Sequence, residues 1–236
     1  MHITILETGE PPDALQGQFP GYGQMMEEML RPIAPAFSFS RHRVFDGEAM
    51  PPVAQVDGVL ITGSAAGAYE GHGWIAPLED FVRDCATAGR PQVGICFGHQ
   101  IIAQALGGTV KKVDKGWGVG AHSYSIEING GHLTPALGRV TCAVSHQDQV
   151  VDLPETAIRL GGSEFCPNGL LGYAHAPILT MQPHPEFTHD YARALLSFRR
   201  GRIPEERVDD GLQTLQGRSD RGAMAQWIAN FYLQSR

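Results

Sequence analysis

The fold of this chain is decided by residues 90–100, Arg90-Pro91-Gln92-Val93-Gly94-Ile95-Cys96-Phe97-Gly98-His99-Gln100. The segment up to Ile95 predicts a short buried strand, and the segment from Phe97 to Leu106 predicts a helix. A cysteine between two glycines at a strand-to-helix turn has the layout of a nucleophile elbow, with sulfur in place of the usual serine oxygen. The stretch therefore predicts both a β-α unit and a reactive thiol, Cys96.

The first half of the chain alternates strand and helix patterns around this unit. Strands are predicted near residues 2–7, 37–44, 56–62 and 91–95, and helices near residues 22–30, 78–85 and 97–106. Repeated β-α units of this length predict a doubly wound, mostly parallel sheet with helices on both faces.

The pattern changes after Gly107-Gly108. Short strands with turn residues between them are predicted near residues 109–113, 122–128, 139–145 and 157–160, which indicates antiparallel additions to the sheet. Another apolar strand is predicted at 178–181, helices near 190–199 and 223–233, and a partly helical surface segment at 201–220. No linker or repeat interrupts the chain, so we expect a single domain over 1–236, with a motif-bearing core at about 55–190 and a C-terminal helical segment at about 190–236.

Composition narrows the class of protein. The chain has 236 residues and a net charge of −7, and its basic residues form no stripe of the kind that binds nucleic acid. No apolar run reaches the roughly 20 residues that cross a bilayer, and the N-terminus lacks the pattern of a signal peptide. The four cysteines, which show no C-x-x-C spacing, favour a reduced cytoplasmic protein.

A second motif, Gln182-Pro183-His184-Pro185-Glu186, follows the predicted strand 178–181. The imidazole of His184 could take the proton of Cys96 and return it to a leaving amine. Glu186 lies two residues further along an extended segment, so it could hold the imidazole tautomer. The helix that begins after Cys96 places the positive end of its dipole beside the sulfur and favours the thiolate. The sequence thus predicts a Cys-His-Glu triad.

A thiol hydrolase also needs donors for the developing oxyanion. The backbone N–H of Phe97, directly after the nucleophile, is the first candidate. The second is Gly63, which follows the buried strand near 56–62. Loss of one such donor costs about 3 kcal/mol of transition-state stabilisation.

Each feature also has a simpler interpretation. A lone cysteine at a strand-helix junction is usually structural, and a lone His-Pro-Glu is usually a loop, but their co-occurrence at two strand ends favours the triad. His184 and His189 leave a zinc site open as a minor alternative, and we predict no metal and no cofactor. His146 could line the substrate cleft, or it could be a turn histidine beside an Asp148 side chain that bonds backbone.

Four segments together resemble one known family. They are Gly94–Gln100, Gln182–Glu186, Thr62-Gly63-Ser64 and Ser145-His146-Gln147-Asp148-Gln149-Val150. They are similar to the class I (triad) glutamine amidotransferases, especially the glutaminase domain of GMP synthetase in stand-alone form.

The resemblance implies a flavodoxin-like α/β fold in which Cys96 attacks the side-chain amide of glutamine. Ammonia then leaves, and water hydrolyses a γ-glutamyl thioester. Gln100 matches the family's glutamine-binding residue, and the backbone near Ser145 and His146 would hold the α-amino acid end of the substrate.

This sequence also departs from the family pattern. The oxyanion loop reads Thr62-Gly63-Ser64 where the family often has Gly-Gly-Pro, and Lys115-Gly116-Trp117-Gly118 replaces a stretch that commonly carries an acidic residue and a tyrosine. No nucleotide-binding motif of a synthetase is present, so any ammonia would pass to a separate synthetase subunit. Two alternatives stay open: a stand-alone γ-glutamyl peptide or amine hydrolase, and a non-catalytic regulatory or binding subunit.

Overall fold

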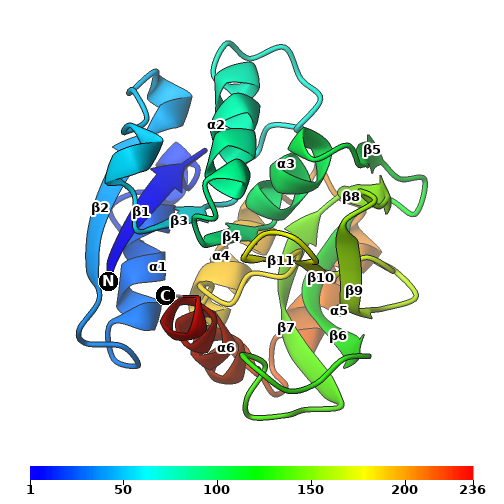
Figure 1. Cartoon of the computed structure of the whole chain (residues 1–236). Helices are drawn as coiled ribbons and strands as arrows, with labels where there is room; N and C mark the ends of the chain where they lie inside the picture. Colours follow the sequence, from blue (N-terminus) through cyan, green and yellow to red (C-terminus); the bar gives the residue numbers. More distant parts are fainter. Residues whose placement is uncertain (236) are drawn as a thin grey trace.

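The computed structural model describes residues 1–235, whose strands form a nine-stranded sheet and a two-stranded sheet (Figure 1). The large sheet has the order β2-β1-β3-β4-β11-β10-β9-β6-β7, and the small one pairs β5 with β8. The strands are β1 His2–Glu7, β2 Ser38–Arg43, β3 Gly58–Ile61, β4 Gln92–Ile95, β5 Thr109–Lys112, β6 Gly118–Ile126, β7 Arg139–His146, β8 Asp148–Asp152, β9 Ala157–Gly162, β10 Leu170–Tyr173 and β11 Ile178–Met181.

The strands from β2 to β11 form the parallel half of the large sheet. Every residue of β3, β4 and β11 is buried, as expected of parallel strands covered on both faces. The order β2-β1-β3-β4 is that of flavodoxin-like sheets. The predicted α/β fold, with a parallel core and antiparallel additions, is confirmed.

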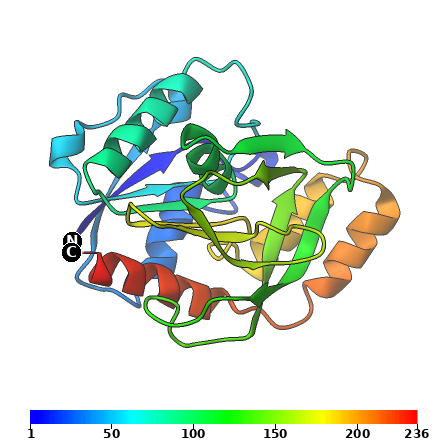
Figure 2. The same cartoon turned by 45° about the vertical axis from the view of Figure 1, so that its right-hand side comes forward.

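The helices are α1 Tyr22–Leu30, α2 Ile75–Thr87, α3 Phe97–Ala105, α4 His189–Phe198, α5 Glu205–Thr214 and α6 Arg221–Gln234. Helices α2 and α3 pack against one face of β3 in one apolar cluster. Helices α1 and α6 pack against the opposite face of β3 in another. Two helical layers therefore enclose the parallel half, as Figures 1 and 2 show.

The antiparallel half, β10-β9-β6-β7, differs from the sequence prediction in detail. Strand β6 begins at Gly118, four residues before the predicted start at His122. Glycines have low strand propensity, but here a Cβ on Gly118 would lie 2.5 Å from the Phe165 ring and one on Gly120 would lie 2.6 Å from the Cα of Gly211. Close packing by α5 and Phe165 therefore requires glycine in this strand.

Strands β8 and β10 were not predicted. Each is short, and β10 depends on antiparallel partners on both sides, β11 and β9. The prediction of a partly helical segment at 201–220 is confirmed by α5, which packs on β6 through the buried Val208 and Gly211. Among the helices of residues 1–235, none has both the length and the apolar character that crossing a membrane demands.

Candidate active site

Cys96 stands at the turn between β4 and α3 in a strained backbone conformation. Its φ of 53° and ψ of −101° lie outside the regions favoured by residues with a side chain. The two flanking glycines permit the turn, because a Cβ on Gly94 would lie 2.4 Å from the Gly98 carbonyl oxygen. A Cβ on Gly98 would likewise lie 2.3 Å from the Ile61 carbonyl oxygen. The structure therefore contains the sharp strand-to-helix turn that the sequence predicts at Cys96.

Strand β11 carries the histidine to this elbow. It pairs in parallel with β4, with Met181 opposite Ile95, so both chains leave the sheet at the same edge. The N–H of Cys96 donates to the Met181 carbonyl at 2.9 Å, and the N–H of His184 donates to the Ala143 carbonyl at 2.8 Å. The two motifs predicted from separate segments thus lie side by side.

His184 and Glu186 form a buried pair beside the thiol. His184 Nδ1 lies 2.7 Å from Glu186 Oε1, and the two residues are only 4% and 1% exposed. The carboxylate requires a proton on Nδ1, so Nε2 is the nitrogen left for Cys96. The Phe187 ring stacks on the imidazole at 4.0 Å and fixes its plane.

The charges of this cluster act strongly on the imidazole. Burial alone disfavours the imidazolium, but the charges of Cys96 and Glu186 and their hydrogen bonds outweigh it and raise the pKa of His184 to about 10. At neutral pH the imidazole is therefore protonated, and a cation beside a cysteine sulfur is the arrangement that favours an activated nucleophile.

Backbone carbonyls of the His-Pro-Glu loop are held from outside the motif. Arg221, the first residue of α6, donates from Nε to the Pro185 carbonyl at 2.9 Å and from Nη2 to the Glu186 carbonyl at 3.3 Å. The C-terminal helix thereby fixes the loop that carries Glu186.

The candidate oxyanion donors lie next to the same atoms. Phe97 is the first residue of α3, so its N–H has no partner within the helix. Gly63 lies so close to the triad that a Cβ on it would be 3.0 Å from His184 Cε1 and 3.7 Å from Cys96 Cβ. The buried hydroxyl of Thr8 lies 2.9 Å from the Thr62 carbonyl and 3.1 Å from the Gly63 carbonyl, so its hydrogen bond orients this loop.

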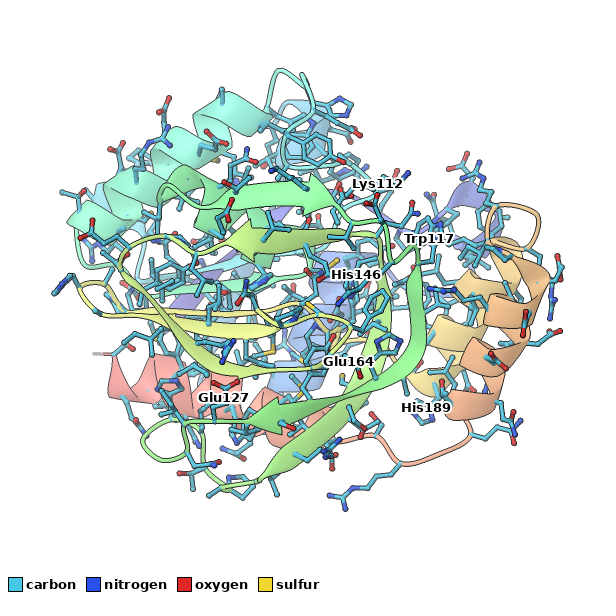
Figure 3. All side chains as sticks on the ribbon, turned by 90° about the vertical axis from the view of Figure 1, so that its right-hand side faces the viewer. Lys112, Trp117, Glu127, His146, Glu164 and His189 are labelled. Atoms are coloured by element: carbon cyan, nitrogen blue, oxygen red, sulfur yellow. The ribbon has the colours of Figure 1, made fainter. Side chains whose placement is uncertain are left out.

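A cavity of ≈ 190 Å³ opens beside Cys96 and contains the predicted substrate residues Gln100, Ser145 and His146. Its wall also includes Ser64, Tyr69, Glu70, Lys112, Trp117, Asp148 and Arg199. Figure 3 shows Lys112, Trp117 and His146 near one another. The cavity is smaller than the 300–1,000 Å³ typical of drug-sized ligands and suits an amino-acid-sized group.

The Asp148 carbonyl organises one wall of this cavity. It accepts from Gln100 Nε2 at 2.9 Å and from His146 Nδ1 at 3.0 Å. Burial lowers the pKa of His146 to about 3, so the ring is neutral. His146 thus lines the cavity and also braces the turn at Asp148. The Asp148 carboxylate, however, accepts from the Tyr69 hydroxyl at 3.2 Å rather than from nearby backbone.

Residues of the site that were not identified from the sequence include Thr8, Tyr69 and Arg199. Thr8 follows β1 directly, and a hydroxyl at the carboxyl end of a parallel strand is a usable signal. Arg199 follows α4, and nothing in its local pattern connects it with Cys96. Within residues 1–235 no three His, Cys, Asp or Glu side chains cluster as metal ligands would, and His189 lies well apart from His146 in Figure 3.

Comparison with known proteins relates this geometry to one family. Residues 39–200 match the family described as glutamine amidotransferase class-I. A glutamine amidotransferase-like protein of Schizosaccharomyces pombe is 28% identical over 250 residues, covering 99% of each chain. One of the chains of the glutamine-hydrolysing GMP synthase of Methanospirillum hungatei is 40% identical over 103 residues, which cover 44% of this chain and 54% of that protein.

Gamma-glutamyl peptidase 3 of Arabidopsis thaliana is 31% identical over 156 residues, covering 63% of this chain and 62% of the peptidase. The chain thus spans about half to three fifths of these last two relatives. Among solved structures, a glutamine amidotransferase from Thermotoga maritima superposes with a TM-score of 0.79 at 20% identity, covering 98% of this chain and 99% of that one. That likeness establishes the fold.

Proposed function

The chain belongs to the class I glutamine amidotransferase family, and we propose that it is a thiol hydrolase that releases ammonia from the side-chain amide of glutamine. One observation carries the proposal: Cys96 stands on a strained elbow against the buried His184–Glu186 pair. The family supplies the reaction class, and the cavity beside Cys96 has room for an amino-acid-sized acyl group.

The first half-reaction forms a thioester. The Cys96 thiolate attacks the γ-carbonyl carbon, and the N–H groups of Phe97 and Gly63 hold the resulting oxyanion. The imidazolium of His184 gives its proton to the amide nitrogen, the C–N bond breaks, and ammonia leaves. Glu186 keeps the ring oriented through Nδ1 while the charge on the imidazole changes.

The second half-reaction regenerates the thiol. Neutral His184 takes a proton from water as the oxygen attacks the γ-glutamyl thioester, and the C–S bond breaks to give glutamate and the Cys96–His184 pair. The Gln100 side chain is held by the Asp148 carbonyl and by Gln182 Oε1 at 3.1 Å. That leaves its own carbonyl oxygen to accept from the ammonium of the substrate.

A second candidate is hydrolysis of γ-glutamyl peptides or amines. Trp117 lines both the cavity at Cys96 and an adjoining cavity of ≈ 500 Å³, which offers space for a leaving group larger than ammonia. The similarity to gamma-glutamyl peptidase 3 supports the same interpretation. The chemistry at Cys96 is shared by both candidates.

Partner, domain and location follow as parts of the proposal. The similarity to one chain of a GMP synthase that is divided into subunits supports a separate synthetase protein as the acceptor of ammonia. The continuous nine-stranded sheet supports a single domain. The four cysteines are free, which supports a reducing, cytoplasmic location.

The test is a substrate panel with the purified chain: glutamine, γ-glutamyl dipeptides and γ-glutamyl amines, each assayed for the released amine. We expect slow turnover of glutamine that rises when a synthetase partner is added; strong turnover of the dipeptides by the chain alone would favour the second candidate. Cys96→Ala should lower turnover by about 10⁴-fold or more, whereas Cys85→Ala, a buried thiol between α2 and the sheet, should stay within about threefold of wild type.

Covalent labelling separates both candidates from a binding-only role. A glutamine-analogue electrophile should add its mass to the peptide that contains Cys96. Absence of labelling together with absence of turnover on the whole panel would contradict the proposed hydrolase.

A further inference from the structure

Arg199 brings a positive charge to the wall of the active-site cavity. It follows the last residue of α4 and lines the cavity together with Cys96. The residue is half-buried, and burial lowers the pKa of Arg199 from its ordinary value. Within residues 1–235, no carboxylate lies within 4.0 Å of it, although many arginines at the surface are paired.

Two neighbours hold the guanidinium in place. Its carbon lies 4.9 Å from the centre of the Trp117 ring, within the range of a cation–π interaction. Nη1 donates to the hydroxyl of Ser145, the residue expected near the α-amino acid end of the substrate. Neither neighbour is an anion; a negative charge on Cys96 favours the guanidinium, but no carboxylate of residues 1–235 pairs with it.

An arginine is seldom desolvated without compensation, because removing a charge from water costs several kcal/mol. Its planar fork matches a carboxylate with two parallel hydrogen bonds. The other cation of the cavity, Lys112, is exposed and lies toward the acidic Asp148. The cavity therefore has an acidic side, with Glu70 and Asp148, and one partly buried cationic wall at Arg199.

We propose that Arg199 binds the α-carboxylate of the γ-glutamyl substrate, and that Trp117 and Ser145 position its guanidinium. The proposal rests on the proposed function and adds to it a specificity residue on the acyl side. A carboxylate recognised there is common to glutamine and to γ-glutamyl peptides, so Arg199 selects the γ-glutamyl group whatever the leaving group is.

This binding is remote from the carbonyl that reacts. The α-carboxylate keeps its charge throughout the reaction. Arg199 therefore binds the substrate equally tightly in the ground state and in the transition state. Its removal should therefore raise KM and leave kcat within about threefold of wild type.

The test uses three p-nitroanilides that share one leaving group. The γ-glutamyl compound carries both α groups, the glutaryl compound lacks the amine, and the 4-aminobutyryl compound lacks the carboxylate. For wild type we expect kcat/KM to fall by about 10- to 100-fold when the carboxylate is removed, the value of a charge-assisted hydrogen-bonded pair.

Arg199→Met should abolish that preference by lowering kcat/KM for the two carboxylate-bearing compounds only. Arg199→Lys should keep part of it. The matched control is Arg202→Met, because Arg202 is an exposed arginine three residues further on and makes no side-chain contact with the cavity. The control should keep the wild-type preference.

Each other outcome is distinguishable. If Arg199→Met turns over substrate but keeps the preference for a carboxylate, Arg199 is not the receptor. Wild type that hydrolyses all three anilides equally would overturn the inference while leaving the hydrolase intact. A wild type that hydrolyses none of them, nor any member of the γ-glutamyl panel, would overturn the proposed function itself.

Discussion

The elbow and the substrate wall of the same cavity are built in opposite ways. The elbow is contiguous: Gly94, Cys96 and Gly98 lie within five residues, and backbone atoms set its shape. The wall is assembled from side chains of distant segments, since Arg199 meets Ser145 across 54 positions and Arg207 meets Trp117 across 90.

Under the proposed function, this difference separates the residues that react from most of those that recognise the substrate. A strained turn between two strand ends places the nucleophile and base in the parallel half of the sheet. The recognition that we propose lies mainly in the antiparallel half and in α4 and α5, with Gln100 on α3 as the exception, so a side chain such as Arg199 should be replaceable without disturbing the elbow. This division is tested by variants that change either the elbow or the cavity wall and leave the other intact.

The largest effect is expected from Gly98→Ala. The added methyl group would meet the Ile61 carbonyl oxygen at 2.3 Å, and neither the strand nor the helix can move away without breaking the elbow. We expect a loss of at least about 3 kcal/mol in the free energy of unfolding, measured by denaturant titration, together with loss of turnover.

Gly73→Ala is the matched control, because no heavy atom lies within 4 Å of a Cβ built there. It should leave stability within about 1 kcal/mol and activity unchanged. Wild-type stability and turnover in Gly98→Ala would show that the elbow does not depend on close backbone packing.

The next effect concerns the pKa of His184. The charge of Cys96 is a main cause of its rise to about 10, so Cys96→Ala should lower the midpoint of the His184 ring, as read by NMR titration. His146, whose pKa burial lowers to about 3, should stay neutral above pH 5 in both proteins and serves as internal control.

The sign of the linked stability follows from the same shift. An imidazole with a pKa near 6.5 in the unfolded chain and about 10 when folded stabilises the fold fully below pH 6.5. This contribution is lost as the pH rises from 6.5 to 10. A His184 midpoint that is the same in both proteins would contradict the charge interaction between Cys96 and His184.

The sequence predicted the elbow well because the residues that determine its shape lie close together in the chain. Two glycines around Cys96, an apolar strand before it and a strand leading to His184 are visible within short windows, and parallel pairing brings the two strand ends together. Even the early Gly63 loop could be placed, since it too follows a strand of this sheet.

Gln100, Ser145 and His146 were expected at the wall and do line it, but the rest of the wall could not be predicted, for the converse reason. Strand β6 begins with glycines that have low strand propensity and are needed only because α5 packs against them. Likewise, Arg199 has the local pattern of a helix end, and its position over Trp117 depends on the three-dimensional packing of α4 and α5 near β6. Such contacts leave no period or spacing in the chain.

The smallest effect should come from Arg207→Met, which loosens the wall without touching the elbow. Arg207, on α5, donates from Nη1 to the Trp117 carbonyl at 2.6 Å and to the Lys115 carbonyl at 3.0 Å, so it fixes the loop that supports Arg199. Losing these two exposed bonds should raise KM for γ-glutamyl substrates about 3- to 10-fold, with kcat within twofold and stability lowered by only about 1 kcal/mol. Steady-state kinetics with Arg202→Met as control measures the split. A fall in kcat at constant KM would place α5 in the chemical step and would contradict the division between the two halves.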